Sequence, residues 1–115
     1  MPLAKELNMY NNQSAEEIAA RIAAGEDLYL LDVREPNEWE IASIAKSEHK
    51  AMSHINEWVG ELPQDREIVV FCHHGGRSAQ VCHALATQAG FTQLTNMTGG
   101  IDRWSLAVDP SVKRY

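Results

Sequence analysis

Residues 68–78 constrain the fold of this chain of 115 residues more than any other stretch. A short apolar run rich in β-branched side chains ends at Cys72, and polar and glycine residues follow it. A helical pattern then covers residues 78–89 and stops at Gly90. An apolar run, a glycine turn and a helix are typical of a buried strand that leads through a loop into a helix N-terminus.

The chemistry of such a loop is electropositive. The first N–H groups of a helix have no partner within the helix, and successive N–H groups in a glycine turn form an anion-binding concavity. A cysteine at the base of this loop is favoured as the thiolate, so we predict Cys72 as a nucleophile. The predicted anion-binding loop consists of His73, His74, Gly75, Gly76, Arg77 and Ser78.

Strands and helices are predicted to alternate along the chain. The predicted strands cover residues 3–7, 28–31, 49–52, 68–71 and 91–95, and residues 11–13 are expected to form a turn. The predicted helices cover residues 15–24, 36–41, a segment capped by Ser53, 78–89 and 101–106. This alternation favours a single α/β domain over residues 1–115, with a parallel sheet of about five strands flanked by helices on both faces.

Composition excludes several classes of function. The formal net charge is −6, and no run of lysine and arginine could bind a nucleic-acid backbone, so no nucleic-acid partner is expected. The longest apolar stretches are too short to span a membrane, and residues 1–13 lack the apolar core of a signal peptide. Two cysteines are too few for a disulfide framework, and a functional thiol suits a reducing compartment. We therefore expect a cytoplasmic protein.

Three segments resemble the rhodanese family in the order and spacing typical of that family. They are the loop that begins at Cys72, the Leu-Leu-Asp-Val-Arg-Glu-Pro run of residues 30–36, and Gly99-Gly100-Ile101 with Trp104 three residues later. The resemblance implies a rhodanese-like fold and a sulfurtransferase without a cofactor. It also implies that Asp32 and Arg34 support the active loop from a neighbouring strand, with Asp32 orienting a loop donor or Arg77.

The reaction that the resemblance implies is covalent sulfur transfer. Cys72 would take the outer sulfur of a small anionic donor such as thiosulfate, or of a persulfide, and pass it to a thiol, to cyanide or to a sulfur-accepting protein. Four residues separate Cys72 from Arg77. Related sulfurtransferases resemble this length, whereas related phosphatases and arsenate reductases carry five. One alternative is a sulfur-carrier module with a dedicated protein acceptor. A phosphatase or arsenate reductase is a second alternative, which the loop length disfavours.

Residues 43–51 depart from the family pattern. Family members have a His-Ile-Pro-Gly-like turn and a later proline here, whereas this chain has Ser43-Ile44-Ala45-Lys46 and then Ala51. Both prolines and the glycine are absent. The departure leaves the shape of this segment, and the donor preference of the site, open.

Several other side chains have two interpretations at this stage. Arg77 either contacts the anion or forms an ion pair at the helix start, and both roles are compatible. His73 and His74 either tune the loop or point to solvent, and Cys82 either packs in the core or resolves a persulfide. A zinc site is a disfavoured alternative for Cys72, His73, His74, Cys82 and His83, because these residues lack a usual ligand spacing.

The remaining aromatic and acidic residues are expected to have structural positions. Trp39, Trp58 and Trp104 are predicted in the core or at its edge, and Trp104 could also line the active loop. The carboxylates expected on solvated helix faces are those of Glu16, Glu17, Glu38 and Glu40.

Overall fold

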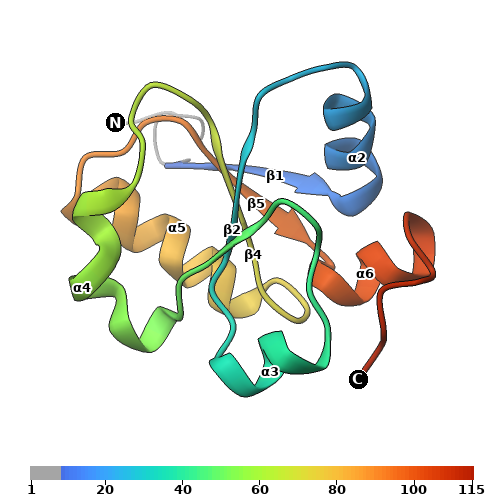
Figure 1. Cartoon of the computed structure of the whole chain (residues 1–115). Coiled ribbons are helices and arrows are strands. Elements are labelled where there is room, and N and C mark those ends of the chain that lie inside the picture. The colour runs from blue at the N-terminus through green and yellow to red at the C-terminus, as the bar shows by residue number, and fades with distance from the viewer. Residues whose placement is uncertain (1–8) are drawn as a thin grey trace.

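The computed structural model describes residues 9–115 and shows one five-stranded parallel sheet (Figure 1). The order of its strands is β1-β5-β4-β2-β3, and every pair of neighbours is parallel. The strands are β1 (Asn11–Ser14), β2 (Tyr29–Asp32), β3 (Glu48–His49), β4 (Ile68–Phe71) and β5 (Leu94–Thr98). The predicted α/β fold with a parallel sheet is therefore confirmed.

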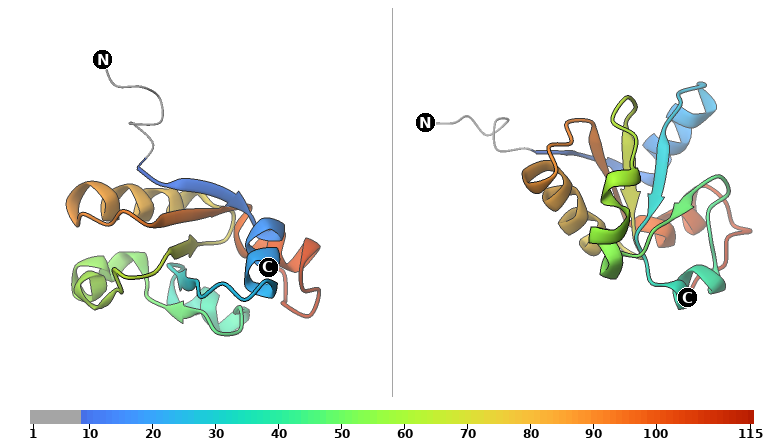
Figure 2. Two further views of the ribbon diagram at one scale, coloured as in Figure 1. Left: turned by 90° about the horizontal axis from the view of Figure 1, so that it is seen from above. Right: turned by 60° about the vertical axis from the view of Figure 1, so that its left-hand side comes forward.

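Helices cover both faces of this sheet (Figure 2). They are α2 (Ala15–Ala23), α3 (Pro36–Ile41), α4 (Ile55–Trp58), α5 (Gly76–Gln88) and α6 (Gly100–Ala107). Two short 3-10 turns, Met52–His54 and Val59–Glu61, flank α4. No helix within residues 9–115 has the length and apolar character that a membrane crossing requires.

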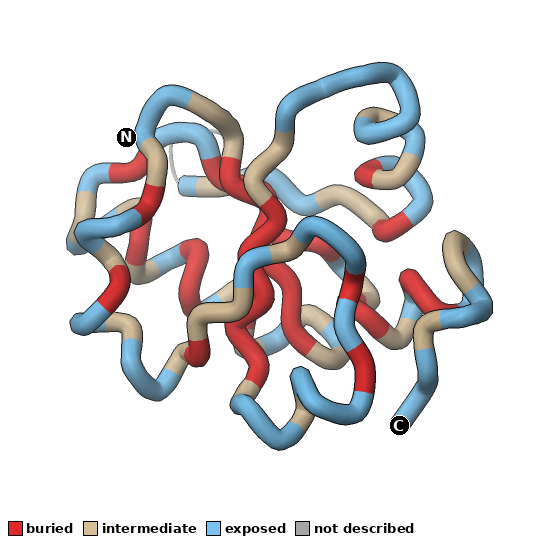
Figure 3. Tube along the Cα trace, viewed as in Figure 1, coloured by how far each residue is buried: buried red, intermediate tan, exposed pale blue. Residues whose placement is uncertain are grey.

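Side chains that alternate along the central strands separate two hydrophobic cores. Ile68 and Val70 of β4 pack with α4 and α5, whereas Val69 and Phe71 pack with α2 and α6. All four β4 residues are completely buried, and Figure 3 shows that burial is concentrated in the central strands. This buried strand fixes the position of Cys72, which follows it directly.

One turn prediction and the bounds of one predicted strand were wrong. Residues 11–13, predicted as a turn, form the edge strand β1, because their backbone pairs with Thr95–Met97 of β5 even though the side chains are polar. The last strand was predicted at residues 91–95 but is Leu94–Thr98, because Phe91 is buried in the core without belonging to the strand. The strand predicted at residues 3–7 lies outside the described residues.

Some element boundaries also differ from the prediction. The strand predicted at residues 49–52 is Glu48–His49, because the chain turns into a 3-10 helix at Met52. Ser53 caps no helix, and its hydroxyl donates to Glu35 Oε1 at 2.7 Å instead. The helix after the cysteine begins at Gly76, two residues earlier than predicted.

Candidate active site

Two backbone amides converge on the sulfur of Cys72. The N–H groups of Gly75 and Ser78 donate to Sγ at 3.1 and 3.3 Å, and the Ser78 hydroxyl lies 3.4 Å away. The sulfur and these donors belong to one segment, residues 72–78, hereafter the Cys72 loop. Cys72 itself is only 1% exposed, although its predicted role as a nucleophile requires an accessible sulfur. The Cys72 loop therefore encloses the sulfur in this conformation.

Glycine makes the turn of the Cys72 loop sterically feasible. Gly75 has a φ of 115° and forms the N-cap of α5. This left-handed conformation costs a residue with a Cβ about 1 kcal/mol or more. The turn directs the Gly75 amide toward the sulfur that precedes it, and Gly76 then begins the helix whose first turn supplies the Ser78 amide.

The N-terminus of α6 fixes the backbone of the Cys72 loop by two hydrogen bonds. The N–H groups of Ile101 and Asp102 donate to the carbonyl oxygens of Cys72 and His73 at 2.9 and 3.1 Å. A Cβ built on Gly100 would lie 2.4 Å from both of these oxygens. Gly100 of the Gly99-Gly100 motif therefore belongs to the site, because only glycine permits this close approach.

Asn96 is a site residue that the sequence analysis missed. It is buried on β5, accepts the Ser78 hydroxyl at 2.5 Å, and donates to the carbonyl of Gly75 at 3.3 Å and to Asn12 of β1 at 3.2 Å. It thus connects the Cys72 loop to two strands. The available signal was an amide side chain between Leu94 and Met97, since a buried polar group needs partners.

Arg77 forms an ion pair with Glu38. Its guanidinium donates to both carboxylate oxygens of Glu38 at 2.6 and 2.9 Å, which is a bidentate geometry. The hydrogen bonds from Arg77 lower the pKa of Glu38 to about 2. Glu38 was predicted on a solvated helix face, which is wrong: its side chain is 15% exposed because it turns toward the Cys72 loop.

Asp32 and Arg34 pair with each other and do not contact the Cys72 loop directly. Both side chains are completely buried, and Arg34 Nε and Nη2 donate to the Asp32 carboxylate at 2.9 and 2.6 Å. Arg34 also donates to the carbonyl oxygens of Glu38 and Ala42 at 3.2 and 2.7 Å. The expectation that Asp32 orients a loop donor or Arg77 is not met. The buried pair instead fixes α3, which carries Glu38.

His73 and His74 lie at the rim of the Cys72 loop. The His73 ring is half-buried and stacks on Tyr115 with a centroid distance of 4.0 Å, and burial lowers its pKa. His74 is exposed, and its Nε2 lies 3.9 Å from Asp102. Among the histidine, cysteine, aspartate and glutamate side chains of residues 9–115, one group of three lies close enough to share a metal ion. It consists of His73, His74 and Asp102. This trio omits both cysteines and His83, so the zinc site considered from the sequence is not assembled.

The other residues singled out in the sequence are structural. Cys82 is 0% exposed within the core, and burial raises its pKa to about 12. Trp58 and Trp104 are buried, as predicted, whereas Trp39 is 45% exposed because α3 lies at the surface. Trp39 stacks on His49 there, with ring centroids 5.7 Å apart.

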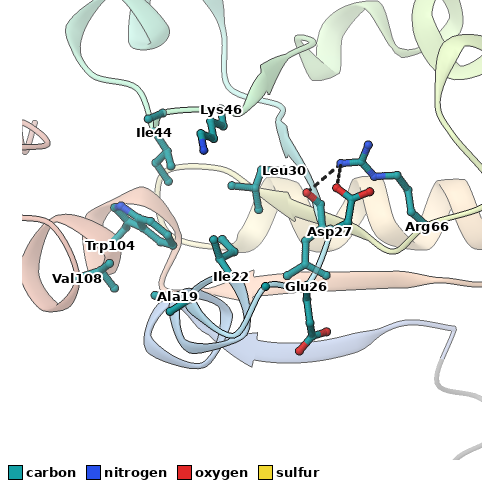
Figure 4. Close-up of a pocket in the computed structure, with 14 residues that line it drawn as sticks. Ala19, Ile22, Glu26, Asp27, Leu30, Ile44, Lys46, Arg66, Trp104 and Val108 are labelled. Carbon is teal, nitrogen blue, oxygen red and sulfur yellow. Dashed lines mark hydrogen bonds and ion pairs between the residues drawn. The ribbon is translucent and has the colours of Figure 1, made fainter.

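A cavity of about 600 Å³ lies away from the Cys72 loop (Figure 4). Leu30, Ile44 and Trp104 line it together with residues of α2 and of the segment after α6. None of residues 72–78 contributes to its lining. Trp104 therefore lines this cavity and not the loop, and the convergent donors around Cys72 are a separate site.

The fold and the site together define the class of this protein. The chain belongs to the rhodanese-like family, because the model of the Rhodanese-like domain matches residues 14–107. A sulfurtransferase of Allochromatium vinosum is 35% identical over 97 residues, which cover 84% of this chain and 90% of that protein. These similarities place the chain in the rhodanese-like family, together with a relative that is named a sulfurtransferase.

Two further similarities extend this result. The Rhodanese-like/PpiC domain-containing protein 12, chloroplastic, of Arabidopsis thaliana is 40% identical over 94 residues, which cover 78% of this chain but only 31% of that protein. The crystal structure of a rhodanese-related protein from Thermoplasma volcanium superposes with a TM-score of 0.76 at 32% identity, covering 92% of this chain and 100% of that one.

Proposed function

We propose that this protein is a thiosulfate or persulfide sulfurtransferase that acts through a persulfide on Cys72. The observation that carries the proposal is the convergence of the Gly75 and Ser78 amides on Sγ at 3.1 and 3.3 Å. Such donors favour a negative charge on the sulfur and on the persulfide that replaces it. We also propose that the protein works in a reducing cytoplasm, where both cysteines stay reduced and form no disulfide.

The proposed reaction has two displacement steps. The Cys72 thiolate attacks the outer sulfur of thiosulfate, the sulfur–sulfur bond of the donor breaks, and its electron pair leaves with sulfite. An acceptor thiolate or cyanide then attacks the terminal sulfur of the Cys72 persulfide. The bond between the two sulfurs breaks, and its electron pair restores the thiolate. No external oxidant or reductant is consumed.

Arg77 supports this reaction mainly by positioning. Because its guanidinium is paired with Glu38, the anionic donor is bound chiefly by backbone N–H groups of the Cys72 loop. The pair fixes the first turn of α5, which supplies the Ser78 amide. Four residues between Cys72 and Arg77 form a narrow loop, which favours a sulfur substrate over a phosphate or arsenate.

A sulfur carrier is the second candidate function. The observation that favours it is the 1% exposure of Cys72, because an enclosed persulfide would be protected until a partner protein opened the loop. The same first displacement step would occur, and only the acceptor would differ. Turnover with a small acceptor therefore distinguishes the two functions.

Intact mass measured after incubation with thiosulfate tests the shared step. Wild type and Cys82→Ala should each gain one sulfur atom, and Cys72→Ala should gain none. Steady-state formation of thiocyanate from thiosulfate and cyanide then supports the enzyme, whereas sulfur uptake without turnover supports the carrier. A wild-type protein that gains no sulfur from thiosulfate or from a persulfide donor contradicts both.

A further inference from the structure

The side chain of Tyr115 contacts the site from the end of the described chain, which lies beside α3 (Figures 1 and 2). Its ring stacks on His73 with a centroid distance of 4.0 Å and an interplanar angle of 8°. Its hydroxyl donates to Glu38 Oε2 at 2.8 Å and accepts from Arg34 Nη1 at 3.0 Å. One ring stack and two hydrogen bonds thus hold this side chain in one place.

These contacts connect the two ends of the Cys72 loop. His73 directly follows the cysteine, and Glu38 binds Arg77 near the other end of the loop. Tyr115 therefore extends from the first residue after the sulfur to the carboxylate that positions α5. A side chain in this position restricts the opening of a loop whose cysteine is already almost completely buried.

The segment that carries Tyr115 lies at the surface of the fold. Lys113, Arg114 and Tyr115 are all exposed, and Tyr115 itself is 37% exposed. Within residues 9–115, the Arg114–Asp102 ion pair is the one salt bridge that the last three residues make, and its two side chains are 57% and 18% exposed. A partly exposed ion pair contributes little to stability, so the contacts of Tyr115 itself are the main interactions that hold this segment at the site.

We propose that Tyr115 gates access to Cys72 and thereby favours small donors and acceptors over bulky ones. This proposal rests on the proposed role of Cys72 as the sulfur-carrying nucleophile. In the closed state the Tyr115 ring and hydroxyl hold the Cys72 loop at both ends. A substrate reaches the sulfur when these contacts break, and larger substrates require wider displacement of the side chain.

The rate at which iodoacetamide alkylates Cys72 in the full chain tests the gate. Tyr115→Ala should accelerate the labelling of Cys72 about tenfold, the order of magnitude expected for the loss of one or two hydrogen bonds. Tyr115→Phe, which keeps the stacked ring, should give a smaller acceleration. Lys113→Ala is the matched control, because Lys113 is exposed in the same segment, and it should label at the wild-type rate.

Cys82 provides an internal reference in the same experiment, because it is completely buried in the core. Equal labelling of Cys72 in wild type and Tyr115→Ala would overturn the gate, and so would acceleration at Cys82, which would indicate general loosening. Labelling does not require sulfur transfer. A missing sulfur uptake therefore refutes the proposed function, whereas unchanged labelling refutes the gate.

Discussion

The two cysteines differ in the groups that surround them and hardly at all in their burial. Cys72 is 1% exposed and Cys82 is 0% exposed. Two backbone amides donate to the sulfur of Cys72, whereas Cys82 packs among apolar residues such as Val81 and Leu85. Burial without donors raises the pKa of Cys82 to about 12. Directed N–H groups, and not exposure, therefore mark a candidate nucleophile in this fold.

Replacing each cysteine tests this comparison with the largest expected effect. Cys72→Ser should lower the rate of sulfur transfer by at least about a thousandfold, because the reaction loses its nucleophile. Cys82→Ser should stay within about twofold of wild type when the rate is corrected for the folded fraction. Thiocyanate formation measures both rates. Comparable losses in the two variants would remove the distinction between the cysteines.

Gly100→Ala should disrupt the packing of α6 against the Cys72 loop. A Cβ at this position would lie 2.4 Å from the carbonyl oxygens of Cys72 and His73, and the φ of Gly100 is 58°. We expect a loss of about 3 kcal/mol in the free energy of unfolding, measured by urea denaturation. Gly60→Ala is the matched control, because nothing lies within 4 Å of its Cβ position, and it should be nearly neutral. Equal stability of the two variants would refute the close approach.

The Glu38–Arg77 ion pair beside the Cys72 loop should make the free energy of unfolding depend on pH. Because the pKa of Glu38 falls from 4.5 to about 2 on folding, its contribution is present above pH 4.5 and is lost as the pH falls toward 2. Allowing for the partial exposure of Arg77, we expect about 1 to 2 kcal/mol. Urea unfolding of wild type and Glu38→Gln at pH 7 and pH 3 should show a difference that shrinks at the lower pH.

The control for this prediction is Glu40→Gln, which removes an exposed carboxylate from the same helix. It should change stability little at either pH. A wild-type advantage over Glu38→Gln that stays constant between pH 7 and pH 3 would mean that the carboxylate is not held in its charged form by Arg77.

Lys46→Gly should have the smallest effect and should spare both cysteines. Lys46 has a φ of 66° in the turn that the Ser47 N–H closes on the carbonyl of Ile44 at 3.2 Å. Glycine removes the strain of this conformation but adds freedom to the unfolded chain, so we expect a net gain of up to about 1 kcal/mol. Thermal unfolding measures the gain. A lower melting temperature would show that Lys46 makes a stabilising contact.

Local signals allowed the strand, loop and helix around Cys72 to be predicted. The apolar run of residues 68–71 is β4, as predicted. A strand buried on both faces is a continuous apolar run, which can be recognised from its own residues alone. The edge strand β1 could not be predicted in the same way. Its residues Asn11–Ser14 are polar, and the backbone of β5 determines their conformation.

The side chains that support the site were harder to predict than the cysteine itself. Arg77 and Glu38 are separated by 39 residues, and Tyr115 and Glu38 by 77. Such pairs depend on how α3 and the C-terminal segment pack against the Cys72 loop, and no local pattern encodes that packing. Gly99 and Gly100 were found by resemblance alone, and the structure supplies the steric reason for Gly100.

Mapping the transferred sulfur tests the central claim most directly. Trypsin cleaves after Arg77 and therefore separates Cys72 and Cys82 into different peptides. After wild-type protein has reacted with thiosulfate, we predict one additional sulfur atom on the peptide that contains Cys72 and none on the peptide that contains Cys82. Sulfur found on the Cys82 peptide, with the Cys72 peptide unmodified, would contradict the account.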